Sequence, residues 1–388
     1  MESILLKDII QKPISGEWGL EDLYGMGIPV LRTANFTNEG IINFENVVTR
    51  NISPSKLKGK LLQKGDILLE KSGGSDRQPV GRVVYFDGQA DKYGFNNFTS
   101  ALRISDLTMW NPKYIFYALY DNYHHGGTRK YENKTTGLHN LKVDLFIRSF
   151  SVPYATLIKQ NEIVKKLDLL NHLENVCEVQ LQKLDELIKS RFIEMFGDLI
   201  NEPKYPGIKL GSLGVMITGG TPSRKHDEYY GGNIPFISTP CLGSNFISEK
   251  NVQNYLTEAG VKNSATHKIP PYSLMVGNRV GVGKSSINTC EMCTNQDILS
   301  FVDIDTSRFD LLFLKKVIDQ YSPYFDEHKR GATIQGVPSK VIKDSMVPDV
   351  PLEMQKRYTA LVKQSDKSKY REAIFLYLLE DIRICCNI

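Results

Sequence analysis

The feature that most constrains the fold of this 388-residue chain is that its two halves repeat each other. The clearest match joins residues 152–160 to residues 347–355, where an apolar-Pro pair, a Leu and a Gln recur at identical spacing. Fainter matches join 27–34 to 233–240 and 134–141 to 330–337. A repeat of this length indicates two copies of one domain, not a solenoid of short units. Two diverged copies suggest a protein that recognises two different things at a fixed separation.

The composition is that of a globular protein without disulfide bonds. Hydrophobic residues make up 41% of the chain and charged residues 24%, which is ordinary for a folded protein and leaves room for two or three domains. The six cysteines show no disulfide-framework spacing. The N-terminus lacks the pattern of a signal peptide, and no apolar run approaches the roughly 20 residues that cross a bilayer. We therefore expect a cytoplasmic protein with no membrane contact.

The sequence pattern of each half of the chain predicts short strands followed by one helix. In the first half, strand-like runs occupy 65–70, 80–86 and 99–104, separated by clusters of Gly, Asn and Asp. The following helix is expected from Pro112 to about Tyr123, because proline suits the first turn of a helix. The second half repeats this order, with strands at 270–276 and 297–302 and a helix over Phe309–Gln320. Two globular domains are thus expected at residues 1–150 and 208–345.

A different kind of sequence separates the two copies. Residues 157–195 contain no Pro or Gly, and apolar residues recur with the 3.5-residue period of a coiled-coil seam. The seam consists of Ile163, Leu167, Leu170, Cys177, Leu181, Leu184, Ile188 and Met195, with Glu174 and Arg191 as the exceptions. A helix within 151–200 would span roughly 60 Å and would end at Gly197, which favours the left-handed cap.

A second long helix is expected within residues 346–388. Its apolar face would hold Tyr358, Leu361, Phe375, Leu379 and Ile382, with a polar stretch at 365–369. The order domain–helix–domain–helix is satisfied most simply if the two helices pair antiparallel, with a domain at each end. The expected fold is therefore α+β, with two globular domains separated by a long antiparallel coiled coil. The alternative is two ordinary amphipathic helices, each packed on its own domain.

Motifs that resemble catalytic or metal sites are incomplete. The stretch Gly281–Ser285 resembles a phosphate-binding loop, but Asn278 occupies the position that requires the first glycine, so a tight turn presenting Arg279 and Lys284 fits better. Cys290 and Cys293 have the spacing of half a zinc site without a second pair of ligands. Asn111–Tyr114 resembles the Asn-Pro-Pro-Tyr motif of adenine methyltransferases, but Lys113 replaces the second proline. We therefore expect a non-catalytic chain without a metal or a bound cofactor.

Basic side chains recur in glycine-rich loops of both copies. The net charge is only +4, yet residues 151–207 hold 7 basic and 9 acidic side chains, so the positive excess lies in the repeated domains. Arg, Asn and Gln can contact base edges, while Lys, Ser and Thr hold phosphates, so the loops predict DNA contact. Solvated surface loops are the alternative. The candidate DNA-binding residues are Arg32, Lys71, Arg77, Arg82, Arg129, Lys130, Lys134, Arg224, Lys225, Arg279, Lys284, Lys329 and Arg330.

Several stretches together resemble one family over essentially the whole chain. The opening of the second domain, Gly219–Ser223, is followed by Tyr229–Ile237, and both resemble the start of a target recognition domain, as does Leu68–Ser75 in the first half. Leu187–Asp198 is similar to the central helix of the specificity subunits of type I restriction–modification systems. Gln364–Ser368 resembles their C-terminal region. The first domain differs, with Ser15–Gly19 in place of a Gly-Gly-Thr-Pro opening.

The resemblance implies a non-catalytic subunit that recognises double-stranded DNA. In this family each recognition domain reads one half of a split site, and the antiparallel helices fix the gap and dock two modification subunits. Those subunits methylate adenine with S-adenosylmethionine, and restriction subunits that use ATP join them. Two different domains would read an asymmetric site, whereas a homodimeric reader would give a palindrome. Two other hypotheses stay open: a nucleotide-dependent DNA-processing enzyme using Gly281–Ser285, and a coiled-coil scaffold without DNA affinity.

Overall fold

The computed structural model, which describes residues 2–135, 138–331 and 335–385, divides into two compact units. The first unit comprises residues 1–176 together with 376–388, and the second comprises 177–375. Two long helices, α5 (Leu157–Phe196) and α10 (Leu352–Cys385), each contribute residues to both units. None of the helices in this described part of the chain is long and apolar enough to cross a membrane.

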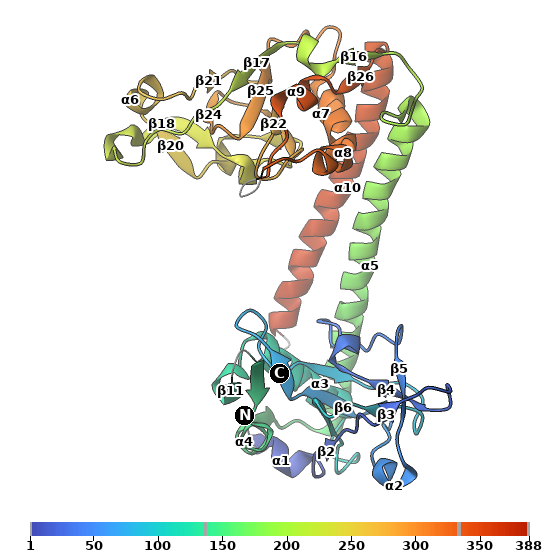
Figure 1. Cartoon of the computed structure of the whole chain (residues 1–388). Coiled ribbons are helices and arrows are strands. Elements are labelled where there is room, and N and C mark those ends of the chain that lie inside the picture. The colour runs from blue at the N-terminus through green and yellow to red at the C-terminus, as the bar shows by residue number, and fades with distance from the viewer. Residues whose placement is uncertain (1, 136–137, 332–334, 386–388) are drawn as a thin grey trace. The chain divides into compact units, whose positions relative to one another are not determined.

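The first unit contains two four-stranded sheets (Figure 1). One has the order β2-β10-β6-β8, and α3 packs against β8. The other has the order β3-β5-β4-β9, in which β4 and β9 are parallel. The bounds are β2 (Ile14–Ser15), β3 (Leu20–Glu21), β4 (Ile28–Leu31), β5 (Val48–Asn51), β6 (Ile67–Glu70), β8 (Val83–Tyr85), β9 (Gly94–Phe95), β10 (Thr99–Leu102) and α3 (Pro112–His124). The strands and the helix predicted for the first half are therefore confirmed.

The second unit repeats the central strands of both sheets, with differences at the sheet edges. Its two sheets have the orders β17-β25-β22-β23-β19 and β20-β18-β24-β21, α7 packs against β22 and β23, and β18 and β24 form the parallel pair. The bounds are β17 (Val215–Thr218), β18 (Tyr230–Ile237), β19 (Phe246–Ile247), β20 (Asn254–Leu256), β21 (Lys268–Ile269), β22 (Leu274–Gly277), β23 (Ser285–Asn288), β24 (Met292–Thr294), β25 (Ile298–Val302) and α7 (Leu311–Gln320). The sequence repeat is thus a repeat of the fold.

In both units a strand at the start of the globular domain pairs with the strand that precedes a long helix. β1 (Ser3–Leu5) is antiparallel to β13 (Ser151–Pro153), and β16 (Gly207–Lys209) is antiparallel to β26 (Met346–Pro348). Short helices complete the units: α1 (Leu6–Ile9), α2 (Pro54–Leu57), α4 (Val143–Ser149), α6 (Glu258–Lys262), α8 (Ser322–Glu327) and α9 (Ser339–Lys343). These strand pairs join each domain to the start of its own long helix.

A buried glutamine makes the same contacts at both of these junctions. Gln160 accepts a hydrogen bond from the backbone N–H of Asn111 (2.8 Å) and donates to the carbonyls of Met109 and Ala155. Gln355 accepts from the N–H of Asp310 (2.9 Å) and donates to the carbonyls of Arg308 and Val350. In both units one of the accepting carbonyls lies two residues before the N-cap of the following helix, and the other lies five residues before the glutamine. This is the physical reason why the glutamine recurs at identical spacing.

The buried side of α5 differs from the predicted seam near the ends of the helix. Leu167, Leu170, Cys177 and Ile188 are buried, but the other apolar seam residues (Ile163, Leu181, Leu184 and Met195) are only half-buried. Phe192 and Phe196, which lie off the seam, are fully buried instead, against Phe313 of α7 and Tyr358 of α10. There the helix packs on a domain core as well as on another helix, which widens its apolar face. Gly197, with φ of 83°, ends the helix as predicted.

The apolar face predicted for α10 is correct at two positions and wrong at two others. Tyr358 and Leu379 are buried, whereas Leu361 and Phe375 are exposed and Val362 is buried in their place. The side chain of Ile382 lies outside the described part of the structure. Within the second unit, Tyr358 donates to the carbonyl of Ile188 and Lys369 pairs with Asp185, so the two helices run antiparallel there. Within the first unit, Leu379 joins the core that contains Leu167 and Leu170.

Candidate nucleic-acid interface

A small sheet positions the basic loops of the first unit. β7 (Ser72–Gly74) pairs with β12 (Leu138–Leu141), which forms a hairpin with β11 (Glu132–Thr135). The loop after β6 therefore lies beside this hairpin. His139 of β12 is buried between Glu132 (2.8 Å) and Asp76 (3.5 Å), and Glu132 also accepts from the N–H of Val80 (3.0 Å). These contacts hold the loop and the hairpin in one arrangement.

A hollow of about 640 Å³ lies next to this sheet. Arg77 and Arg129, two predicted DNA-binding residues that are 52 positions apart in the chain, both line it. Arg129 donates to the carbonyl of Asp76 (3.4 Å), which brings its guanidinium to the loop that carries Arg77. The other lining residues are Asn38, Gln78, Pro79, Tyr123, His124, His125 and Gly126. The arrangement gathers cations and amides, the groups that contact phosphates and base edges.

Reasoning from basic residues alone missed the uncharged members of this hollow. Gln78, Asn38 and the pair His124 and His125 were not among the candidates, although the two histidines directly precede Gly126 in a loop already singled out. The signal that could have found Gln78 is its place beside Arg77 in a glycine-rich loop. No pattern in the sequence indicates Asn38, because only the fold brings it beside α3.

The second unit has a shorter version of the same loops. In the first unit the backbone N–H of Glu70 donates to the carbonyl of Arg82, which closes a loop of residues 71–81. In the second unit the N–H of Gly277 donates to the carbonyl of Lys284, which closes a shorter loop of residues 278–283. Arg330 and Gly336 form a bridge at the position of the β11–β12 hairpin. A Cβ on Gly336 would lie 2.7 Å from Cγ of Arg279, so Arg279 packs directly against this segment. The predicted residues Arg279 and Arg330 thus lie on neighbouring loops.

The other predicted residues differ in how accessible they are. Exposed side chains are those of Arg77, Arg129, Lys130, Arg224, Lys225, Arg279, Lys284 and Arg330, and half-buried ones are those of Arg32, Lys71, Arg82 and Lys329. Lys71 donates to the hydroxyl of Ser15 (2.9 Å), and burial lowers the pKa of its ammonium group. Lys329 pairs with Asp326, and Arg279 lies 3.6 Å from Asp297. The backbone of Lys134 is in β11, but its side chain is outside the described residues.

Arg82 makes structural contacts, and its role in DNA binding stays a prediction. Its guanidinium donates to the carbonyls of Phe36 (3.1 Å) and Thr33 (3.0 Å) and lies 3.5 Å from the carboxylate of Glu70. The side chain is only 14% exposed. Its two terminal nitrogens hold the segment after β4 to the end of β6.

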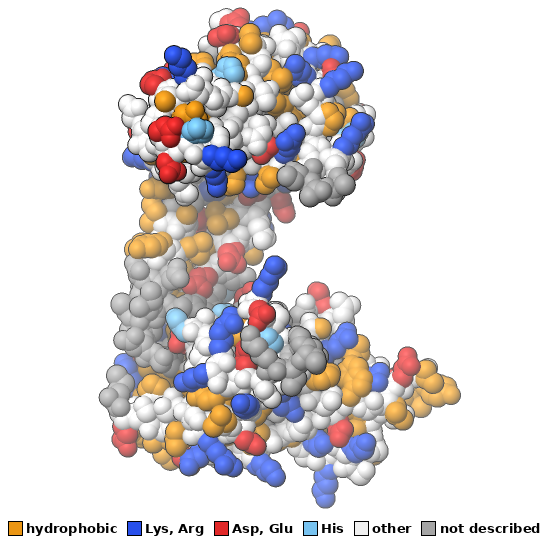
Figure 2. All heavy atoms as spheres, turned by 60° about the vertical axis from the view of Figure 1, so that its left-hand side comes forward, with side chains coloured by type: hydrophobic (Ala, Val, Ile, Leu, Met, Phe, Trp, Pro, Cys, Tyr) orange, Lys and Arg blue, Asp and Glu red, His pale blue; other side chains and the backbone are white. Residues whose placement is uncertain are grey.

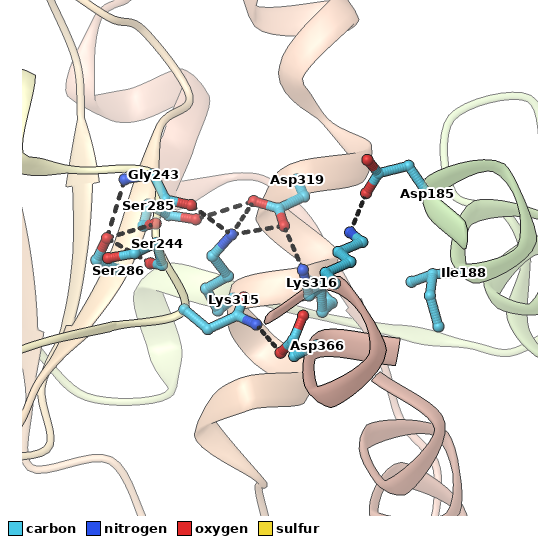
Figure 3. Close-up of polar contacts among 12 residues, drawn as sticks. Asp185, Ile188, Gly243, Ser244, Ser285, Ser286, Lys315, Lys316, Asp319 and Asp366 are labelled. Atoms are coloured by element: carbon cyan, nitrogen blue, oxygen red, sulfur yellow. Dashed lines mark hydrogen bonds and ion pairs between the residues drawn. The ribbon is translucent and has the colours of Figure 1, made fainter. Parts of the chain in front are cut away.

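Lys284, which the sequence pairs with Arg279 in one turn, lines a hollow that Arg279 does not line. The volume of this hollow is about 470 Å³, and Lys189 of α5 and a polar cluster also line it. Figure 3 shows the polar cluster around Lys315 and Asp319. In this cluster, buried Lys315 of α7 pairs with Asp319 (2.7 Å), and Asp319 accepts from Ser285 (3.2 Å). Burial lowers the pKa of the Lys315 ammonium group, and the charge of Asp319 opposes this. The cluster therefore ties β23 to α7.

The incomplete catalytic and metal motifs have structural roles. Gly281–Ser285 lies in the turn between the antiparallel strands β22 and β23, whereas a phosphate-binding loop joins a strand to a helix. Asn111 caps α3 by accepting from the N–H groups of Lys113 and Tyr114. Cys293 is buried in β24, which raises the pKa of its thiol to about 11. Among residues 2–135, 138–331 and 335–385, no group of three His, Cys, Asp or Glu side chains is placed to hold a metal ion.

Lys and Arg side chains are scattered over the visible face of each unit, with Asp and Glu among them (Figure 2). Any selectivity for an anionic partner must therefore come from local clusters of cations. The Arg77–Arg129 hollow and the Arg279–Arg330 loops are two such clusters. Together with the repeated fold, they define a protein that carries two copies of one α+β domain, each with a cluster of exposed cations.

Comparisons with known proteins relate this chain to one family. Residues 205–373 match the model described as the type I restriction modification DNA specificity domain. The specificity subunit of the type I restriction enzyme MjaIX of Methanocaldococcus jannaschii is 26% identical over 155 residues, covering 39% of this chain and 36% of that protein. The specificity subunit of the HindI enzyme of Haemophilus influenzae is 29% identical over 124 residues, covering 32% of this chain and 27% of that protein. The chain thus matches about a third of the length of these curated relatives.

Two solved structures share the fold over nearly the whole chain. One is the type I restriction–modification S subunit from M. genitalium, with a TM-score of 0.60, 13% identity and coverage of 99% of this chain and 94% of that one. The other belongs to work on assembly and conformational transition of a type I restriction–modification system, with a TM-score of 0.59, 14% identity and coverage of 99% and 96%. Residues 205–373 thus form a type I restriction modification DNA specificity domain, and the chain is similar to the specificity subunits of type I restriction–modification systems.

Proposed function

We propose that this chain recognises an asymmetric, two-part site in double-stranded DNA, with each α+β domain reading one half. The observation that carries the proposal is that the two units have the same core of strands but different arginine-bearing loops. The two units share the order of their central strands, the parallel pair and the junction glutamine. The loops after β6 and β22, which hold Arg77 and Arg279, differ in length at the same position of the fold. Such a pair of readers would bind two different half-sites.

The chemistry of the loops supports this reading. Exposed arginines beside amide and imidazole side chains, as around Arg77 and Arg129, can bind phosphates and reach base edges. The β11–β12 hairpin is fixed by His139 and Glu132, so the loops would enter a groove without first being ordered. Because the two copies carry different loops, the site they read would not be a palindrome.

The long helices would set the distance between the half-sites and dock partner subunits. We propose that α5 and α10 pair antiparallel along their lengths as a coiled coil, which the contacts of Tyr358 and Lys369 within the second unit support. The pair still leaves apolar side chains in water, such as Leu187 and Ile193 of α5 and Tyr370 of α10. An exposed apolar face of this kind suits helices of another protein.

The partners would be two modification subunits, which methylate adenine with S-adenosylmethionine, and restriction subunits, which use ATP. This chain would hold no cofactor and carry out no chemistry, and it would act in the cytoplasm. The competing hypothesis of a nucleotide-dependent enzyme lacks support, because Gly281–Ser285 is a hairpin turn. The scaffold hypothesis gives no reason for two differing arginine clusters in equivalent places.

Methylome sequencing of cells that express this chain with its modification subunits tests the proposal. The expected result is methylated adenine within one split, non-palindromic motif. The double variant Arg77→Ala with Arg129→Ala should weaken or relax recognition of one half-site only, and Arg279→Ala with Arg330→Ala that of the other. Exposed Lys12→Ala and Lys262→Ala serve as matched controls, one in each unit.

Three results would count against the proposal. One is a continuous or palindromic motif, and another is equal loss of both half-sites in either double variant. The third is ATP turnover or methyl transfer by the purified chain alone. Titration of duplex DNA at rising salt adds an independent check, since affinity that ignores salt is incompatible with phosphate contact.

A further inference from the structure

A short segment of the first unit exposes several large apolar side chains. They lie in β3 and in the loop between β3 and β4. The exposed fractions of these residues are 74% for Leu20, 75% for Leu23, 83% for Tyr24 and 85% for Met26. We call these four residues the apolar tip. In Figure 1 the chain projects here beyond β4, and in Figure 2 hydrophobic side chains gather at a projecting end of this unit. Single exposed apolar residues are ordinary, but a cluster of four marks an interaction surface.

The tip is held in one conformation before anything binds it. The carboxylate of Asp22 accepts hydrogen bonds from the N–H groups of Met26 (3.1 Å) and Gly27 (2.9 Å). A hydrogen bond from the hydroxyl of Thr49, with those from the backbone, lowers the pKa of Asp22. A Cβ on Gly27 would lie 2.5 Å from the carbonyl oxygen of Arg50, so only glycine fits. A preformed loop loses little conformational freedom when it binds.

The charge of the segment decides between possible partners. Residues 19–27 contain Glu21 and Asp22 and no Lys or Arg. Side chains that wedge into DNA are accompanied by cations that hold the phosphates, and an acidic loop would instead be repelled. Anionic membrane surfaces are disfavoured for the same reason. The complement of this surface is an apolar pocket bordered by Lys or Arg, which a protein can provide.

The second copy does not have this feature at the equivalent place. Residues 28–31 of β4 correspond to residues 234–237 of β18, so residues 19–27 correspond to residues 225–233. That segment is described throughout, and it exposes Lys225, His226, Asp227 and Glu228 but no large apolar side chain. The fold therefore does not require an apolar tip, and the tip is a property of the first domain alone.

We propose that the apolar tip docks into an apolar pocket bordered by basic side chains on a modification subunit, a contact that only the first domain makes. The choice of partner rests on the proposed function. Tyr and Met are among the residues enriched at the centres of protein interfaces, where a few large side chains carry most of the affinity. The acidic residues at the base of the tip would pair with the basic rim.

The test measures the affinity of the purified full-length chain for its modification subunit by titration. The triple variant Leu23→Ser, Tyr24→Ser, Met26→Ser should raise the dissociation constant by roughly 10- to 100-fold. The matched control, Leu107→Ser with Met109→Ser, removes two other exposed apolar side chains of the same unit and should bind as the wild type does. Glu21→Gln should weaken binding by a few fold at low salt, and the effect should vanish at high salt.

Other outcomes would overturn the inference. Unchanged affinity in the triple variant refutes it, as does weaker binding to a random DNA duplex with unchanged partner affinity, which would make the tip a DNA wedge. Wild-type self-association that the variant abolishes would assign the tip to a second copy of this chain. Thermal melting checks folding, and if the triple variant unfolds, Tyr24→Ser alone takes its place. A wild-type chain that binds no modification subunit refutes the proposed function instead, so the two failures are distinguishable.

Discussion

The junction glutamines provide the sharpest test of how each domain is attached to its helix. In Gln355→Met the new side chain is of similar length and also unbranched, so it fills the space but makes none of the three hydrogen bonds. The variant leaves the N–H of Asp310 without a partner and removes a donor from the carbonyls of Arg308 and Val350. A buried polar group without its partner costs roughly 1–3 kcal/mol, so the total should be about 3 kcal/mol.

Differential scanning calorimetry of the full-length chain measures this loss. For a unit of 150–250 residues, 1 kcal/mol corresponds to roughly 2–4 °C, so the transition of the second unit should fall by about 6–12 °C. Hydrogen exchange locates the effect, because protection should drop at the amide of Asp310 and in the first turn of α7. Gln160→Met should act equally on the first unit, since its contacts are the same.

Gln364→Met is the control, because this exposed glutamine lies on the same helix. A shift below about 2 °C for Gln355→Met, or a shift in Gln364→Met of the same size, would refute the reasoning. Either result would mean that β26 and the aromatic cluster around Tyr358 hold the helix to its domain without the glutamine.

Three more predictions concern stability and assembly. Burial raises the pKa of Glu70 above its ordinary value of 4.5, against the charge of Arg82, so its stabilisation is complete below pH 4.5 and is lost as the pH rises through the folded-state pKa. Glu70→Gln should flatten that part of the stability curve in calorimetry at several pH values, and an unchanged slope would contradict the assignment. Arg82→Met should destabilise the first unit by roughly 2 kcal/mol or more without altering the salt dependence of DNA binding; normal stability with weaker DNA binding would instead support a role of Arg82 in DNA binding. Leu181→Glu with Leu184→Glu puts charges on the half-buried seam and should abolish co-purification with modification subunits, whereas Lys183→Glu should not; an intact complex on size-exclusion chromatography would rule out the seam.

Sequence alone determined the parts of this protein that depend on local pattern and on spacing. The recurring Pro, Leu and Gln revealed two copies of one domain, and the Pro- and Gly-free stretch revealed α5 up to its glycine cap. The cap and the first turn of α3 followed from Asn111 and Pro112. These features are set by neighbours a few residues apart, so a single sequence contains the information they need.

Tertiary structure decided which charged and apolar side chains are free. Arg77 and Arg82 look alike in sequence, yet one lines an open hollow and the other bonds to Thr33 and Phe36 from a distant loop. Phe192 is off the seam but fully buried, because a domain core meets the helix there. No pattern in the sequence shows that the apolar tip is exposed, and only the folded structure shows that no other residues cover it. Accessibility depends on contacts between residues far apart in the chain, and no local pattern contains it.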